Sequence, residues 1–368
     1  MLSHEANGES ATYLLASVSE PDPASTTLPG RSAAQPGHAG GERGHADAIW
    51  SSKWAATQGG GEVVVTGSAD HTLKLWNPQA PAAPTRTLRS PKGLGVVAVD
   101  VDKHDQGASF LVSSTLDSVI TRWSVDGEHE ARKTFGPAAS WDISLHPRAE
   151  TMSTGGADGK VLVLSSAVDS FGDELATLEA KGSFVTAVEY SKGGNLLAVA
   201  TDAGYVTLFD AETGSLISSF PAHSAPIRSL SFTSTLLITA SDDRRVNVFD
   251  LRALTSSAAS ASGGRRGQVA SLGGHEGWVV NVAARNERLL ASGSSDGTIK
   301  LFDLAAPSLA LSTLRDHTGD VWTVAWAPER ASGAAGVEGL GGAVAGLGGG
   351  RMVSAGEDGR VRWWNGGG

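Results

Sequence analysis

Cysteine is absent from this chain of 368 residues, which excludes disulfide bonds and metal sites built on thiolates. Long apolar runs are absent as well, and none approaches the about 18–20 residues that a membrane-spanning helix needs. The first ten residues carry two Glu and no Lys or Arg, so neither a secretory signal nor a basic transit peptide is visible. These absences predict a protein of the cytoplasm and nucleus that has no membrane partner.

Positive charge is scarce: 29 Lys and Arg face 39 Asp and Glu, for a formal net charge of −10. Nucleic-acid binding normally depends on a basic face that neutralises phosphates, so we expect no direct nucleic-acid partner. Phosphate loops of the GxxxxGK[ST] type and the HExxH and GxSxG motifs are also missing, and the His residues do not follow metal spacings. We therefore expect no cofactor, no metal and no small-molecule substrate, and protein partners are favoured.

What the chain does have is a repeat. A small-residue stretch, an Asp in a turn, alternating aliphatic residues and a final aromatic or Leu recur every 40–45 residues or so. Self-similarity at this period is typical of a β-propeller, in which each repeat supplies one four-stranded blade. The sequence thus predicts an all-β, seven-bladed propeller. The seven copies end at Trp76, Trp123, Leu164, Phe209, Phe249, Phe302 and Trp364.

Three segments interrupt the repeat at residues 19–42, 252–267 and 328–350. They are rich in Gly, Ala, Ser or Pro and poor in apolar anchors, so we expect disordered loops there. Removing their 63 residues leaves 305, or about 44 per blade, which supports the count of seven. A single propeller over residues 12–365 follows, with short tails at 1–11 and 366–368.

Closure of the ring needs one further strand. The last repeat ends at its third strand, and the one spare apolar stretch is residues 13–18. We expect this N-terminal segment to pair as the outer strand of the last blade and so to lock the ring.

A set of His, hydroxyl, Asp and aromatic residues has the composition of a hydrolase site. A hydrolase needs one such set in one cleft, whereas this chain repeats it four times, so a structural role is favoured and the chain is not expected to be an enzyme. Buried polar groups need such mutual hydrogen bonds. Repeats two to four lack the His and are expected to be the softest blades. The four sets are His45, Thr66, Asp70 and Trp76; His223, Thr239, Asp243 and Phe249; His275, Ser292, Asp296 and Phe302; and His317, Ser354, Asp358 and Trp364.

Candidate binding residues lie where each inner strand begins, an edge of the ring that we call the rim. The fourth residue after each His is apolar and expected to be buried, whereas the third and fifth can reach the open face. Exposed aromatics beside charges are typical of interaction hot spots, although packing between blades is the alternative, expected for Trp54 and Trp326. Acidic neighbours would favour a basic group on the ligand. The predicted partner-binding residues are Trp50, Trp141, Arg228, Trp278, Asp320, Trp322, Asp242 and Glu357.

Several strings resemble the WD-repeat subunit of the superkiller complex, in the same blades and the same order. The resemblance implies that the four repeated sets are the structural tetrads of WD repeats. It also implies a scaffold that grips short partner segments containing an Arg and a hydrophobic residue. The strings are residues 45–51, 94–100, 225–230, 239–243, 278–282 and 316–322.

That resemblance implies particular partners. Members of this family join an RNA helicase and a TPR-repeat scaffold protein in the superkiller complex, which feeds messenger RNA to the exosome for 3′-to-5′ decay. In plants and animals, similar proteins also belong to the nuclear polymerase-associated factor (PAF) complex, which is linked to transcription elongation and histone methylation.

A different class of function stays open. Residues 249–252, Phe-Asp-Leu-Arg, resemble the WDxR box of propellers that act as substrate receptors of cullin ubiquitin ligases. That resemblance would place Arg252 against the ligase adaptor.

Overall fold

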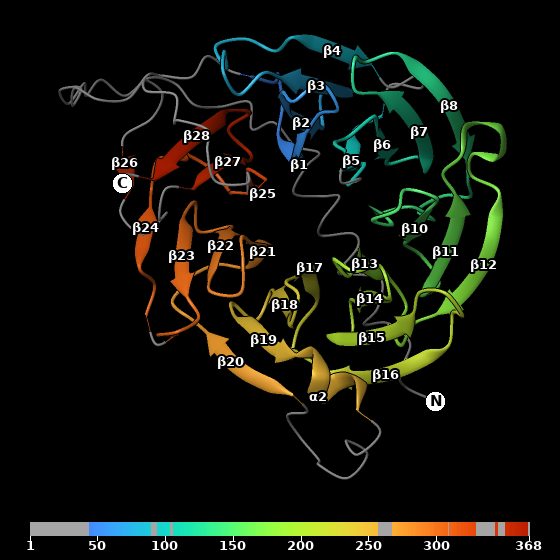
Figure 1. The fold of residues 1–368 in the computed structure, drawn as a ribbon. Coiled ribbons are helices and arrows are strands. Elements are labelled where there is room, and N and C mark those ends of the chain that lie inside the picture. Colours follow the sequence, from blue (N-terminus) through green and yellow to red (C-terminus); the bar gives the residue numbers. More distant parts are fainter. Residues whose placement is uncertain are drawn as a thin grey trace, which may run out of the picture. The chain divides into compact units, whose positions relative to one another are not determined.

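The computed structural model describes residues 44–89, 94–103, 106–256, 267–307, 309–328, 343–344 and 350–366, which fall in one compact unit. Within these residues, seven four-stranded sheets are arranged around a common centre as the blades of a β-propeller (Figure 1). The predicted fold class is therefore confirmed. The expected closing strand at residues 13–18, the tail at 1–11 and the loop at 19–42 lie outside the described residues.

Blades 1 to 6 share one topology, in which four consecutive antiparallel strands run from the inner to the outer edge. Blade 1 comprises β1 (Ile49–Ala56), β2 (Glu62–Ser68), β3 (Thr72–Trp76) and β4 (Arg86–Arg89). Blade 2 comprises β5 (Val96–Val101), β6 (Phe110–Thr115), β7 (Val119–Ser124) and β8 (His129–Thr134). Blade 3 comprises β9 (Asp142–Leu145), β10 (Thr151–Gly155), β11 (Lys160–Ser165) and β12 (Glu174–Glu179), with a short 3-10 turn at Val168–Ser170.

The next three blades continue around the ring in chain order. Blade 4 comprises β13 (Val185–Tyr190), β14 (Leu196–Thr201), β15 (Tyr205–Asp210) and β16 (Leu216–Pro221). Blade 5 comprises β17 (Ile227–Phe232), β18 (Leu236–Ser241), β19 (Val246–Asp250) and β20 (Gln268–Leu272). Blade 6 comprises β21 (Val279–Ala284), β22 (Leu289–Ser294), β23 (Ile299–Asp303) and β24 (Ser312–Leu314).

Blade 7 is built differently at its outer edge. Its strands β25 (Thr323–Trp326), β27 (Arg351–Ala355) and β28 (Val361–Gly366) are antiparallel, but the strand in fourth place, β26 (Ala343–Val344), runs parallel to β28. β26 comes from the segment 328–350, for which the sequence indicates only a loop. The rest of that segment, apart from Pro328 and Gly350, lies outside the described residues.

The insertion predicted at residues 252–267 begins as a helix rather than a loop. In α2 (Leu251–Thr255), the Asp250 carboxylate accepts the Arg252 N–H as an N-cap, and Leu251 and Leu254 are buried. An Asp followed by two apolar residues three positions apart is typical of a helix start. The repeat period alone does not indicate this helix. This is the one α-helix in the described part of the chain, and no helix there has the length and apolar character of a membrane span.

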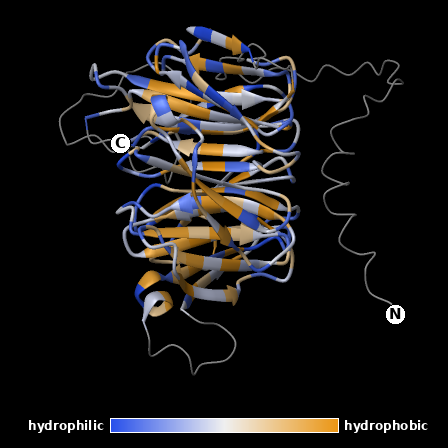
Figure 2. Ribbon diagram, turned by 90° about the vertical axis from the view of Figure 1, so that its right-hand side faces the viewer, coloured by the Kyte–Doolittle hydropathy of each residue, from blue (hydrophilic) through white to orange (hydrophobic). Residues whose placement is uncertain are grey.

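The core lies between neighbouring blades, because each sheet packs one face on the next. Val65, Leu73 and Leu75 of blade 1, for example, pack with Val96 and Leu111 of blade 2. Middle strands are buried on both faces, so they read as continuous runs of aliphatic and small residues. Figure 2 shows these hydrophobic residues concentrated in the strands and hydrophilic residues at the turns.

Candidate functional site: the rim and its supports

Four polar networks support the turns that lead into the inner strands. In blade 1, His45 Nδ1–H donates to the Asp70 carboxylate at 2.9 Å, and the Thr66 hydroxyl donates to His45 Nε2 at 2.7 Å. The Trp76 indole N–H donates to the same hydroxyl oxygen at 2.9 Å. His45 joins two strands of its blade to the incoming turn, so the network fixes the backbone just before the rim.

The other three sets have the same geometry. The distances from His Nδ1 to the Asp carboxylate and from His Nε2 to the hydroxyl are 2.9 and 2.7 Å in blade 5, 2.9 and 2.7 Å in blade 6, and 3.1 and 2.8 Å in blade 7. Of these three sets, only that of blade 7 repeats the indole bond, from Trp364 to Ser354 at 2.8 Å, because blades 5 and 6 have Phe249 and Phe302. The structure thus brings together each set that the sequence indicates.

The protonation of these networks suits a structural role. Burial would raise the pKa of Asp70, but hydrogen bonds from His45 and Thr72 outweigh it and hold that pKa below its usual range. Burial also lowers the pKa of His45 against the pull of Asp70, so the imidazole is neutral near pH 7. Both ring nitrogens of His45 are occupied by protein groups, which leaves neither of them to serve as a base toward a ligand.

Blades 2 and 3 use other polar contacts in place of the His. The Trp123 indole still donates to Ser113 at 3.0 Å in blade 2. In blade 3, Ser140 stands where the other inner strands have a buried apolar residue, and its hydroxyl oxygen lies 2.6 Å from that of Thr154 and 2.7 Å from that of Ser114. A chain of hydroxyl groups therefore joins blades 2 and 3 just below the rim.

At the rim, a large side chain from one blade repeatedly meets the first turn of the next. Trp50 of blade 1 lies against Gly95, where a Cβ would come within 2.6 Å of the indole. Trp141 packs edge-on against Phe184, with ring centroids 5.5 Å apart. The Arg228 guanidinium lies 5.9 Å from the Trp278 ring centroid. The candidate residues thus cover the boundaries between blades 1 and 2, 3 and 4, and 5 and 6.

Phe184 is a rim residue that the sequence reasoning missed. It precedes the buried Val185 just as Trp278 precedes Val279, so aligning inner strands instead of His positions would have found it. Repeat four has no His to count from. Counting from the His positions therefore passes over Phe184.

Arg228 and Asp242, both predicted as rim residues, bind each other. The guanidinium donates two hydrogen bonds to the carboxylate, from Nε at 2.8 Å and from Nη2 at 2.6 Å. The pair is compact, bidentate and mostly buried. Asp242 therefore adds no net negative charge to the rim, in contrast to the role that the sequence suggests for it.

Asp320 and Glu357 supply the negative charge instead. The Asp320 N–H donates to Glu357 Oε2 at 3.2 Å, which brings the two acidic residues together at the start of blade 7. Burial, followed by the charges of Glu357 and Asp296, raises the pKa of Asp320 to about 6. Ionising such a carboxylate costs free energy, and a cation beside it lowers this cost. The site therefore favours a basic partner group.

The indoles differ in exposure. Trp278 is 46% exposed, whereas Trp50, Trp141 and Trp322 are half-buried at the rim. Trp54 is buried and packs edge-on against Trp363, and the Trp326 indole N–H donates to a main-chain carbonyl at 2.9 Å. Trp326 is half-buried like Trp50, Trp141 and Trp322, so exposure separates only Trp54 from the rim indoles.

One cavity among the described residues is remote from the rim. A cavity of about 510 Å³ between blades 1 and 2 is lined by residues at the opposite strand ends, including Gln58, Asn77 and Asp126. No group of three or more His, Asp or Glu side chains in the described ranges has the arrangement of a metal site.

Comparison with known families assigns the repeats. The family described as WD domain, G-beta repeat matches residues 41–77, 266–303 and 309–365, and the anaphase-promoting complex subunit 4 WD40 domain matches residues 172–235. The WD repeat-containing protein SL1-17 of Schistosoma mansoni is 30% identical over 217 residues, which are 57% of this chain and 69% of that protein. This chain belongs to the WD-repeat family.

Two further relatives of this WD-repeat protein are more distant. The WD repeat-containing protein VIP3 of Arabidopsis thaliana is 28% identical over 206 residues, 52% of this chain and 62% of that protein. The meiotic recombination protein rec14 of Schizosaccharomyces pombe is 27% identical over 193 residues, 50% of this chain and 61% of that protein. The matches thus span less than two thirds of these two relatives.

Proposed function

We propose that this WD-repeat protein is a non-catalytic scaffold that holds segments of partner proteins on its rim. The observation that carries the proposal is that the exposed Trp278, the half-buried Trp322 and the Asp320–Glu357 pair all lie at the rim of the adjacent blades 6 and 7. A large exposed aromatic beside a desolvated charge is the composition of a binding hot spot. The tetrads place these side chains on rigid turns, which lowers the entropy lost on binding.

The chemistry of the rim defines the partner segment. A basic side chain next to Asp320 and Glu357 would neutralise their negative charge. It would also favour ionisation of Asp320, whose pKa is raised when no cation lies beside it. Trp322 lies on the same blade as these acids and Trp278 on the preceding one, and both offer apolar contacts to neighbouring residues of the segment. We expect an extended segment with one Arg or Lys and a hydrophobic residue near it.

The resemblance to the superkiller WD-repeat subunit supports particular assemblies as part of this proposal. The partners would be the TPR-repeat scaffold protein and RNA helicase of that complex in the cytoplasm, and PAF complex subunits in the nucleus. The name of the relative rec14, a meiotic recombination protein, adds meiotic recombination as a process in which a similar protein takes part.

Affinity purification of the tagged full chain tests the proposal, with Trp278→Ala/Trp322→Ala beside the wild type. Recovery of a TPR-repeat protein and a helicase with the wild type, and their loss with the double variant, is the expected result. Equal recovery with both proteins would refute the rim assignment. Leu309→Ala is the matched control, since Leu309 is 78% exposed just before the outer strand of blade 6 and away from the rim.

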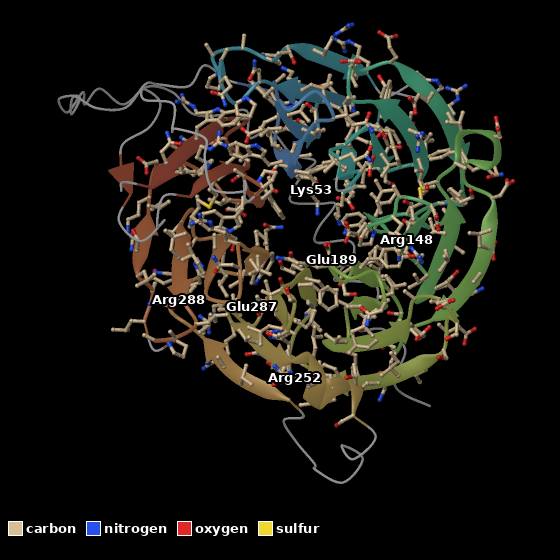
Figure 3. The ribbon with its side chains drawn as sticks, in the orientation of Figure 1. Lys53, Arg148, Glu189, Arg252, Glu287 and Arg288 are labelled. Carbon is tan, nitrogen blue, oxygen red and sulfur yellow. The ribbon has the colours of Figure 1, made fainter. Side chains whose placement is uncertain are left out.

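A substrate receptor of a cullin ligase is the second candidate, favoured by one observation. Arg252 of the WDxR-like string is exposed on α2, at the outer part of blade 5 (Figure 3). The same purification separates the two functions, because recovery of a cullin adaptor that is lost in Arg252→Ala would support this candidate alone.

A further inference from the structure

Five charged residues gather at the centre of the ring on one side. Lys53 of β1, Asp100 of β5, Asp142 of β9 and Glu189 of β13 belong to four consecutive inner strands, and Lys103 follows β5. Figure 3 shows Lys53 and Glu189 pointing toward the centre from their two blades.

Their contacts cross the ring as well as following it. The Glu189 carboxylate of blade 4 lies 3.4 Å from Lys103 Nζ of blade 2 and 3.9 Å from Lys53 Nζ of blade 1. Asp100, which is fully buried, lies 3.1 Å from Lys103 Nζ and 3.7 Å from Lys53 Nζ. Glu189 thus joins blade 4 to two blades that are not its neighbours.

Two of the carboxylates also bind the backbone of the following blade. Asp100 accepts the Leu145 N–H at 2.7 Å, and Asp142 accepts the Val188 N–H at 2.9 Å. Together with the lysine contacts, these bonds form a closed circuit through the inner strands of blades 1, 2, 3 and 4.

On the other side of the ring, uncharged side chains make the equivalent bonds between neighbours. Ser229 accepts the Val282 N–H at 3.3 Å, and Asn281 accepts the Val324 N–H at 3.0 Å. Thr323 in turn accepts the N–H of Ser52, on the first inner strand, at 3.0 Å. Among the described residues, these bonds join adjacent blades only. The ion pairs of the charged side, which join blades that are not neighbours, therefore differ from these hydrogen bonds.

The charged side contains the three blades that have no tetrad, together with blade 1, which has one. Blades 2, 3 and 4 lack the His that ties the incoming turn to the strands in blades 1, 5, 6 and 7. The same inner strands carry half of the rim: Trp50 lies three residues before Lys53, and Trp141 immediately precedes Asp142. A contact that holds these strands together also sets the spacing of Trp50 and Trp141.

We propose that the charged cluster is a brace across the ring centre that replaces the missing tetrads of blades 2 to 4 and positions the Trp50–Trp141 half of the rim. Its importance for binding rests on the proposed function, whereas the brace itself is a property of the isolated chain. Glu189→Gln removes the ion pairs that reach from blade 4 to blades 1 and 2, whereas Lys53 and Lys103, whose side chains are 33% and 31% exposed, keep Asp100 as their partner.

Hydrogen exchange and fluorine NMR of the full chain test the brace without any ligand. In Glu189→Gln, amides of β9, β10, β13 and β14 are expected to exchange about tenfold faster or more, while those of β21 to β23 keep their rates. In the same variant labelled with 5-fluorotryptophan, the fluorine resonances of Trp141 and Trp50 are expected to shift or broaden. The resonances of Trp278 and Trp322 are expected to stay unchanged.

Glu287→Gln is the matched control, because the Glu287 carboxylate also joins two blades, accepting bonds from Thr233, Ser234 and Thr235, but away from the ring centre. Lys103→Gln provides a second, milder variant, since Lys103 is 31% exposed and its loss leaves Lys53 in place. Unchanged exchange in both Glu189→Gln and Lys103→Gln, or a uniform increase over all seven blades, would overturn the proposal. Neither result depends on whether the rim binds a partner.

Discussion

The indole of Trp50 lies directly over Gly95 across the boundary between blades 1 and 2. A Cβ at residue 95 would come within 2.6 Å of the indole Cζ3 and 3.2 Å of the Ala69 backbone, so any larger residue must push Trp50 away. Gly95 therefore sets the position of a rim indole from the neighbouring blade.

Gly95→Ala is expected to displace Trp50 and to lower the free energy of unfolding by about 1–3 kcal/mol, the usual cost of overpacking. Chemical denaturation measures the loss, and the fluorine resonance of a labelled Trp50 reports the displacement. Gly136→Ala is the control, because a Cβ there meets nothing within 4 Å. An unmoved Trp50 resonance in Gly95→Ala would show that the contact is not held in solution.

Loss of a tetrad hydroxyl should destabilise the ring. Thr66→Val keeps the shape of the side chain but leaves His45 Nε2 and the Trp76 N–H without their shared partner. We expect the free energy of unfolding to fall by about 2–4 kcal/mol, because two buried polar groups lose their bonds. His71→Asn, at an exposed turn, should change it by less than about 0.5 kcal/mol. Equal free energies of unfolding for Thr66→Val and the wild type would contradict a structural role for the tetrad.

The stability of the chain should depend on pH through Asp142. Burial, opposed by the Val188 N–H and the charge of Lys53, raises the pKa of Asp142 to about 7 from an ordinary value of 3.8. The folded state then binds more protons than the unfolded state between these two values, so this contribution to stability falls as the pH rises toward 7 and is lost above it.

Asp142→Asn removes that dependence. Between pH 5 and pH 8, the wild type should lose about 3 kcal/mol of unfolding free energy relative to Asp142→Asn, measured by denaturant titration at each pH. Asp126→Asn, on an exposed turn, serves as the control and should follow the wild type. Parallel pH profiles for wild type and Asp142→Asn would contradict the assignment.

Closure of the ring by the N-terminal segment stays a prediction. Among the described residues, the outer edge of β28 is paired only at Asn365 and Gly366, by the two residues of β26. Deleting residues 1–20 is expected to lower the melting temperature by at least about 5 °C, whereas deleting residues 1–11 should leave it unchanged. A melting temperature unaffected by the longer deletion would show that residues 13–18 do not close the ring.

The repeat predicts the fold well because each period corresponds to one blade. Contacts within a single blade, such as that between His45 and Asp70, follow from the same alignment of the repeats. Relations between blades do not, since they join positions with no fixed spacing: Glu189 to Lys53 across the ring, or Trp141 to Phe184 at the rim. The pairing of Arg228 with Asp242 shows the same limit, because a sequence indicates two charges but not that they neutralise each other.

Calorimetric titration of a co-purified partner segment into the full chain tests the central claim, that the rim binds proteins, most directly. We predict that Trp322→Ala and Trp278→Ala each weaken binding by about 2 kcal/mol or more with little change in folding, while Leu309→Ala binds like the wild type. Wild-type affinity in both tryptophan variants would contradict the account.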